Sequence, residues 1–350
     1  MISATVPSLD ITEIIPFDNF DLQLLDRPGM PRFRDIVQQA IRGELDLSLS
    51  GILNSGMQVI FGELMASTGL LRQLLIIAIL SALLSCLTEA FKHKSAGELG
   101  FYVTFLMTVL LAISSFYLSV EILNGVVSLV SGIMLASIPL MTSIMIMSGN
   151  VVGAASFNPL MFFALQLTTW FVTIVYVPLI LASAGLDLVN YLSETVKLDK
   201  LAELIRKIAD WALKGIAGIF ALLLTLQRFS APIASNVAIR TTHSALGAIP
   251  VVGSALNAAV DTVIHFGQAA RSGVLVALVL VLCIAMATPL LKMAVLSGMY
   301  RIVAGFIQPV ADPRLVTCMD IAARHMGHLF RAGAIVGVMC IYAVVILLSF

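Results

Sequence analysis

The sequence is poor in charged residues for its length. Asp, Glu, Lys and Arg make up 11% of the 350 residues, whereas 59% are hydrophobic. A soluble domain of this size needs more charge to solvate its surface, so the composition places the chain in a lipid bilayer. Lys plus Arg and Asp plus Glu number 20 each, which leaves no basic face of useful size for nucleic acid.

Cysteine pairs and enzyme signatures are lacking as well. The four cysteines (Cys86, Cys283, Cys318 and Cys340) show no close spacing, which argues against a disulfide framework and a zinc site. There is no P-loop, no H-E-x-x-H, no G-x-S-x-G and no carboxylate pair embedded in a spanning segment. We therefore expect a non-enzymatic protein without catalytic residues, cofactor or metal.

The first 69 residues form a region distinct from the rest. Residues 1–26 contain five acids and no base, the reverse of the basic start of a signal peptide. In residues 33–65 the apolar side chains recur with a helical period. We interpret 1–69 as an acidic lead followed by amphipathic helices, and 70–350 as a polytopic membrane domain.

Long apolar stretches dominate residues 70–350. Most are close to the length needed to cross about 30 Å of hydrocarbon, whereas Gly215–Phe229 is short and Leu160–Val189 is long. They are Leu70–Leu87, Phe101–Val120, Val126–Met147, Leu160–Val189, Gly215–Phe229, Gly273–Leu291 and Ala332–Leu348. The predicted fold is an all-α polytopic membrane protein with about six or seven spanning helices, amphipathic interfacial helices and a central helical hairpin. Pro139 and Pro178 predict kinks.

The basic residues create a problem of parity. Lys92 and Lys94 mark one end of the first span as cytoplasmic, and the five bases in 197–214 belong on the same side. The three stretches between these two basic segments contain no Lys or Arg, and three is an odd number of crossings. We favour a broken or re-entrant segment among them. Asp187, near the end of the third stretch, is interpreted as an interfacial residue.

Residues 197–214 are the clearest amphipathic helix in the sequence. Its apolar stripe consists of Leu198, Leu201, Leu204, Ile205, Ile208 and Trp211. The opposite face offers the i,i+4 ion pairs Glu203–Lys207, Arg206–Asp210 and Asp210–Lys214. This pattern predicts a helix lying in the headgroup region, with Trp211 at the interface.

The central segment 230–272 carries two polar stripes on either side of I-P-V-V-G (Ile249–Gly253). Candidate residues that line a path or an interface recur at helical spacing: Asn236, Arg240 and His243 before the turn, then Asn257, Asp261 and His265 after it. The pattern predicts a helical hairpin on the side opposite the basic loops. Intramembrane ionisable groups normally face a cavity or pair with each other. Three alternatives stay open: a conduit wall, a subunit interface, or a hairpin lying flat on the membrane with its charges in water.

Two smaller clusters have competing interpretations. Asp261 and His265 form either a solvated ion pair, which is favoured, or a proton relay, and Arg240 is a possible partner of Asp261 across the turn. Cys318, His325 and His328 share a helical face that could suggest a metal. Neighbouring Arg324 and Arg331, and the lack of a fourth ligand, argue against it.

Several motifs in order make the chain resemble the stage III sporulation protein AE family. They are V-A-I-R-T-T-H (Val237–His243), I-P-V-V-G (Ile249–Gly253), A-V-D-T-V (Ala259–Val263), Tyr300-Arg301, Gln308-Pro309 and D-P-R-L-V-T-C-M-D (Asp312–Asp320). The resemblance extends from Ile41-Arg42-Gly43-Glu44 to the C-terminus.

The resemblance implies a permease-like subunit of the channel or secretion-like complex between mother cell and forespore. It further implies sibling stage III sporulation proteins as partners, among them a cytoplasmic ATPase and ring-forming membrane proteins, and a place in the mother-cell membrane around the forespore. The alternatives from the residues alone are a self-contained secondary transporter of a small solute or ion, coupled to protons by Asp261 and His265, and a membrane anchor whose hairpin only packs.

Overall fold

The computed structural model describes the backbone of residues 62, 65, 68–91, 94–147, 151–192, 198–247, 253–309 and 311–348. Within these ranges it leaves out the side chains of 70, 78, 81–82, 84–91, 94–101, 144, 147, 151–153, 156–158, 191–192, 227–273 and 347–348. The described backbone is almost entirely helical and contains no strand, which confirms the all-α prediction. Its helices are α4 (Thr68–Phe91), α5 (Lys94–Met147), α6 (Val151–Trp170), the π-helix η2 (Phe171–Tyr176), α7 (Val177–Leu192), α8 (Asp199–Gly247), α9 (Gly253–Ile307) and α10 (Pro313–Leu348).

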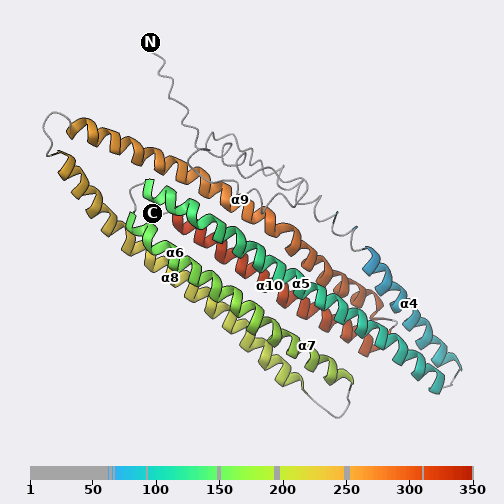
Figure 1. Cartoon of the computed structure of the whole chain (residues 1–350). Coiled ribbons are helices and arrows are strands. Elements are labelled where there is room, and N and C mark those ends of the chain that lie inside the picture. The colour runs from blue at the N-terminus through green and yellow to red at the C-terminus, as the bar shows by residue number, and fades with distance from the viewer. Residues whose placement is uncertain are drawn as a thin grey trace.

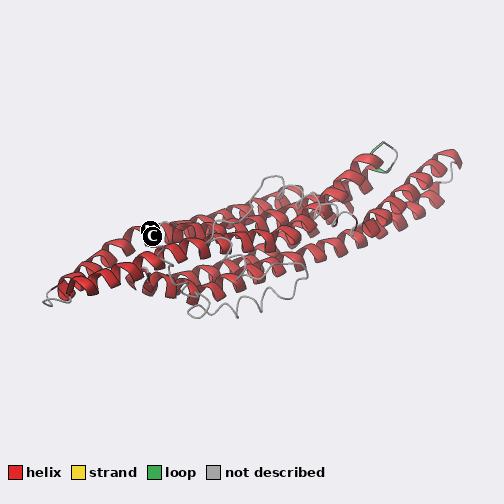
Figure 2. Cartoon of the chain, turned by 90° about the horizontal axis from the view of Figure 1, so that it is seen from above, coloured by secondary structure: helices red, strands yellow, loops and turns green. Residues whose placement is uncertain are grey.

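The helices lie side by side in an elongated bundle (Figure 1). Helix α10 packs most extensively on α9, and it also contacts α5, α7 and α8. The view from above shows the same elongated shape (Figure 2). The helices α6, η2 and α7 form one continuous passage, and successive passages of the chain run in opposite directions. The start of α5, the end of α7, the start of α8 and the α9–α10 connection therefore all lie at one end of the bundle (Figure 1). We call this the basic end.

Helix α5 resolves the parity problem. It is one helix of 54 residues, so the stretches 101–120 and 126–147 belong to a single element. Between Lys94 and Lys200 the chain therefore passes along the bundle twice, once in α5 and once in α6–η2–α7. Two is an even number, and the predicted broken or re-entrant segment is wrong.

Other apolar stretches that the sequence suggested as separate spans also belong to longer helices. Among the described residues, five helices are long and apolar enough to cross a membrane, close to the about six or seven spans predicted for the whole chain. They comprise Tyr102–Ser143, Pro159–Asn190, Asp199–Leu226, Val274–Ile307 and Pro313–Ile346. The apolar stretches at 215–229, 273–291 and 332–348 are each part of a longer helix, because the polar residues next to them are compatible with helix and do not end it.

The proline at 178 coincides with a local change of helix type. The π-helix η2 ends two residues before it, and the Val177 N–H donates to the carbonyl of Val172, five residues back. Proline supplies no N–H and disturbs the i→i−4 ladder on its N-terminal side. A π turn is one of the recognised ways to accommodate such a disturbance.

The start of α10 has a local cause in the sequence. Asp312 precedes the first helical residue Pro313, and its Oδ1 accepts a hydrogen bond of 2.8 Å from the Arg314 N–H. The Asp312 carbonyl accepts the first helical bond, from the N–H of Leu315 at 3.0 Å. Asp as N-cap and Pro at the first helical position explain why the chain turns back here.

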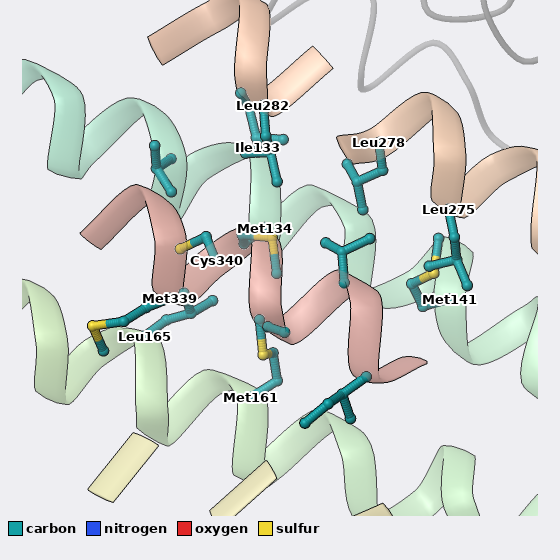
Figure 3. Close-up of a cluster of buried hydrophobic side chains, with 14 of the residues drawn as sticks. Ile133, Met134, Met141, Met161, Leu165, Leu275, Leu278, Leu282, Met339 and Cys340 are labelled. Atoms are coloured by element: carbon teal, nitrogen blue, oxygen red, sulfur yellow. The ribbon is translucent and has the colours of Figure 1, made fainter. Parts of the chain in front are cut away.

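Apolar side chains from four helices meet in the half of the bundle away from the basic end (Figure 3). Labelled members of this core are Ile133, Met134 and Met141 of α5, Met161 and Leu165 of α6, Leu275, Leu278 and Leu282 of α9, and Met339 and Cys340 of α10. Flexible methionines fill the gaps between helices that cross at different depths. A second buried cluster, which includes Tyr176, Met293 and Leu329, continues the core toward the basic end.

Two glycines of α10 allow a close helix contact. A Cβ on Gly337 would lie 1.6 Å from Cε of Met286 on α9, and a Cβ on Gly333 would lie 2.9 Å from Cδ2 of Leu290. Glycines four residues apart present a shallow groove, and small residues at this spacing are common where membrane helices approach closely. The side chains of α9 therefore fill space that any larger residue of α10 would take.

Helix α8 differs most from its prediction. Residues 197–214 do not form a separate helix, because α8 continues to Gly247. Most of the predicted apolar stripe points out of the bundle, with Leu204, Ile208 and Trp211 exposed by 53%, 51% and 77%. The inward face is formed by small residues such as Ala202 and Ala209, together with Arg206 and Asp210. An apolar face toward lipid and a polar face toward protein is the arrangement expected of a helix inside a membrane.

Candidate functional site: a buried charge cluster

A carboxylate, a guanidinium and an imidazole from three helices meet inside the bundle at its basic end. Asp187 of α7 is 4% exposed, and its Oδ2 accepts hydrogen bonds from the Arg206 guanidinium of α8 and from Nε2 of His325 of α10, the latter at 2.9 Å. Arg206 also donates to Oγ of Ser183 at 3.2 Å. His325 is fully buried. Asp187, interpreted from the sequence as interfacial, is therefore the centre of a buried network.

A second set of polar groups lies beside the first. Nδ1 of His328 is 3.2 Å from Oδ1 of Asp210 on α8. The Tyr176 hydroxyl, from η2, donates to the His328 carbonyl at 3.0 Å and lies 3.4 Å from the same carboxylate oxygen. The rings of His325 and His328 are 6.2 Å apart between centroids, so the two sets are neighbours along α10. We refer to Tyr176, Asp187, Arg206, Asp210, His325 and His328 as the charge cluster.

The charge cluster contains two carboxylates and one guanidinium. With both imidazoles neutral its net charge is −1, and one proton on either His325 or His328 brings it to zero. Charged groups buried in a protein are tolerated when they are paired and hydrogen-bonded. Nδ1 of His325 has no hydrogen-bond partner among the described residues, which favours the neutral ring with its proton on Nε2, toward Asp187. The arrangement can hold a proton and ties α7, α8 and α10 together.

Removing the Tyr176 hydroxyl tests whether the second set contributes to stability. Tyr176→Phe keeps the buried ring but loses the hydrogen bond to the His328 carbonyl, so we expect a loss of about 1 kcal/mol in the free energy of unfolding. Thermal unfolding of the purified protein in detergent measures it. Tyr117→Phe is the matched control, because Tyr117 is 71% exposed. Equal midpoints for Tyr176→Phe and wild type would contradict a structural role of this hydrogen bond.

The structure locates the six predicted site residues only by their backbone. Asn236, Arg240 and His243 lie in α8, and Asn257, Asp261 and His265 lie in α9. Their side chains fall outside the described part, as do residues 248–252. The helical segments that carry them meet at the end of the bundle opposite the basic end, where α8 and α9 extend past the other helices (Figure 1). Whether their polar stripes face each other stays a prediction.

The face of Cys318, His325 and His328 is occupied by other partners. The two imidazoles point to Asp187 and Asp210, and Cys318 is buried among apolar side chains at 1% exposure. Among the described residues, no three His, Cys, Asp or Glu side chains are grouped closely enough to hold a metal ion.

The charge cluster was not predicted from the sequence, although each member was visible there. Glu203 and Lys207 form the expected pair at 2.8 Å, but Arg206 turns to Asp187, and Asp210 turns to His328. The i,i+4 rule assumes that a helix has only its own side chains as partners. The signal that could have found the cluster is Asp187 itself, an ionisable residue inside a long apolar segment, which calls for a partner on another helix.

Comparison with known proteins points to the same family in two ways. Residues 32–350 match the model of the family described as stage III sporulation protein AE. A curated relative, "Stage III sporulation protein AE" of Bacillus subtilis (strain 168), is 28% identical over 315 residues, which cover 89% of this chain and 79% of the relative. No solved structure matches.

The family match includes every described helix from α4 to α10 and also the segment 230–272 that carries the predicted motifs. The family match therefore agrees with the motifs found in the sequence and with the five apolar helices of the fold. The chain therefore belongs to the stage III sporulation protein AE family and is a multi-pass helical membrane protein.

Proposed function

We propose that this protein is a permease-like, non-enzymatic subunit of the channel or secretion-like complex that joins mother cell and forespore during sporulation. The observation that carries the proposal is the length of the helices in a sporulation-family membrane protein. Helices α5, α8 and α9 have 54, 49 and 55 residues, or about 75–80 Å at 1.5 Å per residue. A bilayer with its headgroups is only about 40–45 Å thick. These helices therefore offer surfaces outside the membrane to other subunits.

The partners we propose are the sibling stage III sporulation proteins, including a cytoplasmic ATPase and ring-forming membrane proteins. The chain has no nucleotide-binding motif, so any work driven by ATP has to come from another subunit. The proposed location is the mother-cell membrane around the forespore. The basic end, with Lys200, Lys207 and Arg301, faces the mother-cell cytoplasm by the positive-inside rule.

In this proposal, the stripes Asn236–Arg240–His243 and Asn257–Asp261–His265 line a path or dock a partner on the far side of the membrane. Their support is the helical spacing of the residues and the position of their backbone at the end of α8 and α9 beyond the other helices. An arginine and an aspartate at the tips of two helices suit recognition of a partner or passage of polar solutes.

The test replaces Arg240 or Asp261 by Ala in sporulating cells. We expect late gene expression in the forespore to fall severalfold while the level of the protein in the membrane stays normal, because the stripes are needed for assembly or passage and not for folding. The matched control is Lys200→Ala, which removes an exposed charge at the basic end. Normal expression in both stripe variants would refute the assignment of these residues.

A secondary transporter is the second candidate, and the charge cluster is the observation in its favour. Two imidazole–carboxylate pairs inside candidate spans are groups able to take up and release a proton. Reconstitution of the purified protein in liposomes separates the two functions. Solute uptake driven by a proton gradient without partners supports the transporter, whereas co-purification of sibling proteins without such uptake supports the channel subunit.

A further inference from the structure

A hollow of 460 Å³ opens between α9 and α10 near the basic end, and its lining is rich in arginine. Arg301 comes from α9, and Arg324 and Arg331 come from α10. None of its lining residues is a carboxylate. Three guanidinium groups around one open hollow are an unusual concentration of charge in a chain with no net charge. Such a site attracts an anion.

The arginines are only partly satisfied by the protein. Arg324 pairs with Asp320 of its own helix at 2.7 Å, and this pair is about half exposed. The Nε of Arg331 donates to the Gly327 carbonyl at 3.3 Å, which engages the guanidinium through its inner nitrogen. Arg301 is exposed at the rim. One carboxylate against three guanidinium groups leaves an excess of two positive charges.

The other walls of the hollow are apolar or lack a side chain. Phe330 provides an apolar surface, and Gly298 leaves space, since a Cβ there would meet no atom within 4 Å. The Ser297 hydroxyl is already engaged, because it donates to the Ala323 carbonyl at 2.8 Å. A ligand that fits this lining has an anionic group beside an apolar part. Free phosphate would use the arginines and leave the apolar wall in water.

The hollow also lies next to the charge-free apolar segments of both helices, which suits a lipid headgroup. The charge-free apolar segment of α9 ends at Leu291, directly before Lys292, and that of α10 begins at Ala332, directly after Arg331. Each segment, 273–291 and 332–348, is about as long as the hydrocarbon layer is thick. The lining residues of the hollow start just beyond both segments, on the side that carries the positive charges. Basic pockets between membrane helices on that side are typical binding sites for anionic headgroups.

The geometry points to a binding site for the phosphodiester headgroup of an anionic phospholipid from the cytoplasmic leaflet. The phosphate lies between Arg301 and Arg331, and the glycerol and upper acyl chain lie along Phe330 and the open space at Gly298. The lipid bridges α9 and α10 at the level where the charge cluster holds α10 to α7 and α8. This assignment is independent of the proposed channel function.

The test uses the full chain, purified in mild detergent and freed of lipid, and counts bound lipid by native mass spectrometry. We expect short-chain phosphatidylglycerol to bind much more tightly than phosphatidylcholine. The double variant R301Q/R331Q should lose roughly fivefold per guanidinium, or about 25-fold, in phosphatidylglycerol affinity. The control R72Q/K200Q removes two exposed charges outside the hollow and should bind as wild type. Equal affinities for wild type and R301Q/R331Q would overturn the site.

A second variant separates the hollow from general surface charge. Gly298→Leu fills the open space without changing any charge, and it is expected to fold, because the new side chain starts in empty space. We expect it to weaken phosphatidylglycerol binding at an unchanged thermal midpoint. Unchanged lipid binding in this variant would overturn the hollow in favour of diffuse attraction. Binding of inorganic phosphate in competition with the lipid, at equal or higher affinity, would overturn the lipid assignment in favour of a free anion.

Discussion

Asp187→Ala is expected to destabilise the protein more than any other single change in the charge cluster. Without the carboxylate, the Arg206 guanidinium keeps its charge at 12% side-chain exposure and the buried His325 loses its acceptor. Leaving a buried charge without its partner typically costs about 3–5 kcal/mol. We expect a correspondingly lower free energy of unfolding and little monodisperse protein after detergent extraction, measured by thermal unfolding and size-exclusion chromatography.

Two further variants test whether the lost charge of Asp187 causes the loss of stability. Asp187→Asn keeps one acceptor oxygen but removes the charge, so its stability should lie between those of wild type and Asp187→Ala. Glu203→Gln breaks an ion pair on the same helix whose side chains are both exposed, where an ion pair contributes little to stability, and it should behave as wild type. If Asp187→Ala unfolds at the same temperature as Glu203→Gln, the charge cluster does not hold the helices together.

Gly337→Leu is expected to be the most damaging change in the apolar half of the bundle. The Cβ alone would lie 1.6 Å from Cε and 2.8 Å from Sδ of Met286, so both the methionine and the helix axes have to move. Overpacking of a close-packed interior usually costs about 1–3 kcal/mol, and here the loss of the close α9–α10 approach adds to it. Thermal unfolding in detergent measures the effect.

If the contact with Met286 causes the loss of stability, a smaller residue at position 286 should restore it. Met286→Ala makes room on α9, so the double variant Gly337→Leu with Met286→Ala should regain a large part of the stability lost by Gly337→Leu alone. Gly218→Leu is the control, because a Cβ at Gly218 meets no atom within 4 Å. Without any rescue in the double variant, the contact between these two positions is not the cause of the damage.

The apolar stretches were enough to predict a helical membrane protein, but they did not predict where one helix ends and the next begins. A hydropathy window separates 101–120 from 126–147 because Glu121 and Asn124 lie between them. The backbone has no reason to break there, since both residues are compatible with helix, and Glu121 is exposed on the surface of α5. The start of α10 is set locally in the sequence, because Asp312 and Pro313 act on the backbone directly.

The orientation of α8 was not predictable from its pattern for a different reason. In a water-soluble protein the apolar stripe of Leu204, Ile208 and Trp211 would face the protein core, whereas in a membrane it would face lipid. The pattern therefore distinguishes the two faces of the helix but does not show which of them packs against the protein. The partners of Arg206 and Asp210 come from Asp187 and His328, which are 19 and 118 residues away in sequence. Contacts at such separations depend on how the helices pack, which periodicity within one helix does not contain.

The exposed surface of α5 has a consequence for how the protein can be handled alone. Among the described side chains, its exposed large apolar residues are concentrated between Tyr102 and Tyr117, and after the exposed Glu121 only Leu135 and Ile146 follow. The stretch from Tyr102 to Tyr117 rises by about 22 Å, which is less than the about 30 Å of hydrocarbon in a bilayer. One ordinary detergent collar can therefore cover this part of α5 after extraction, and the solitary subunit is expected to associate only when that collar is removed.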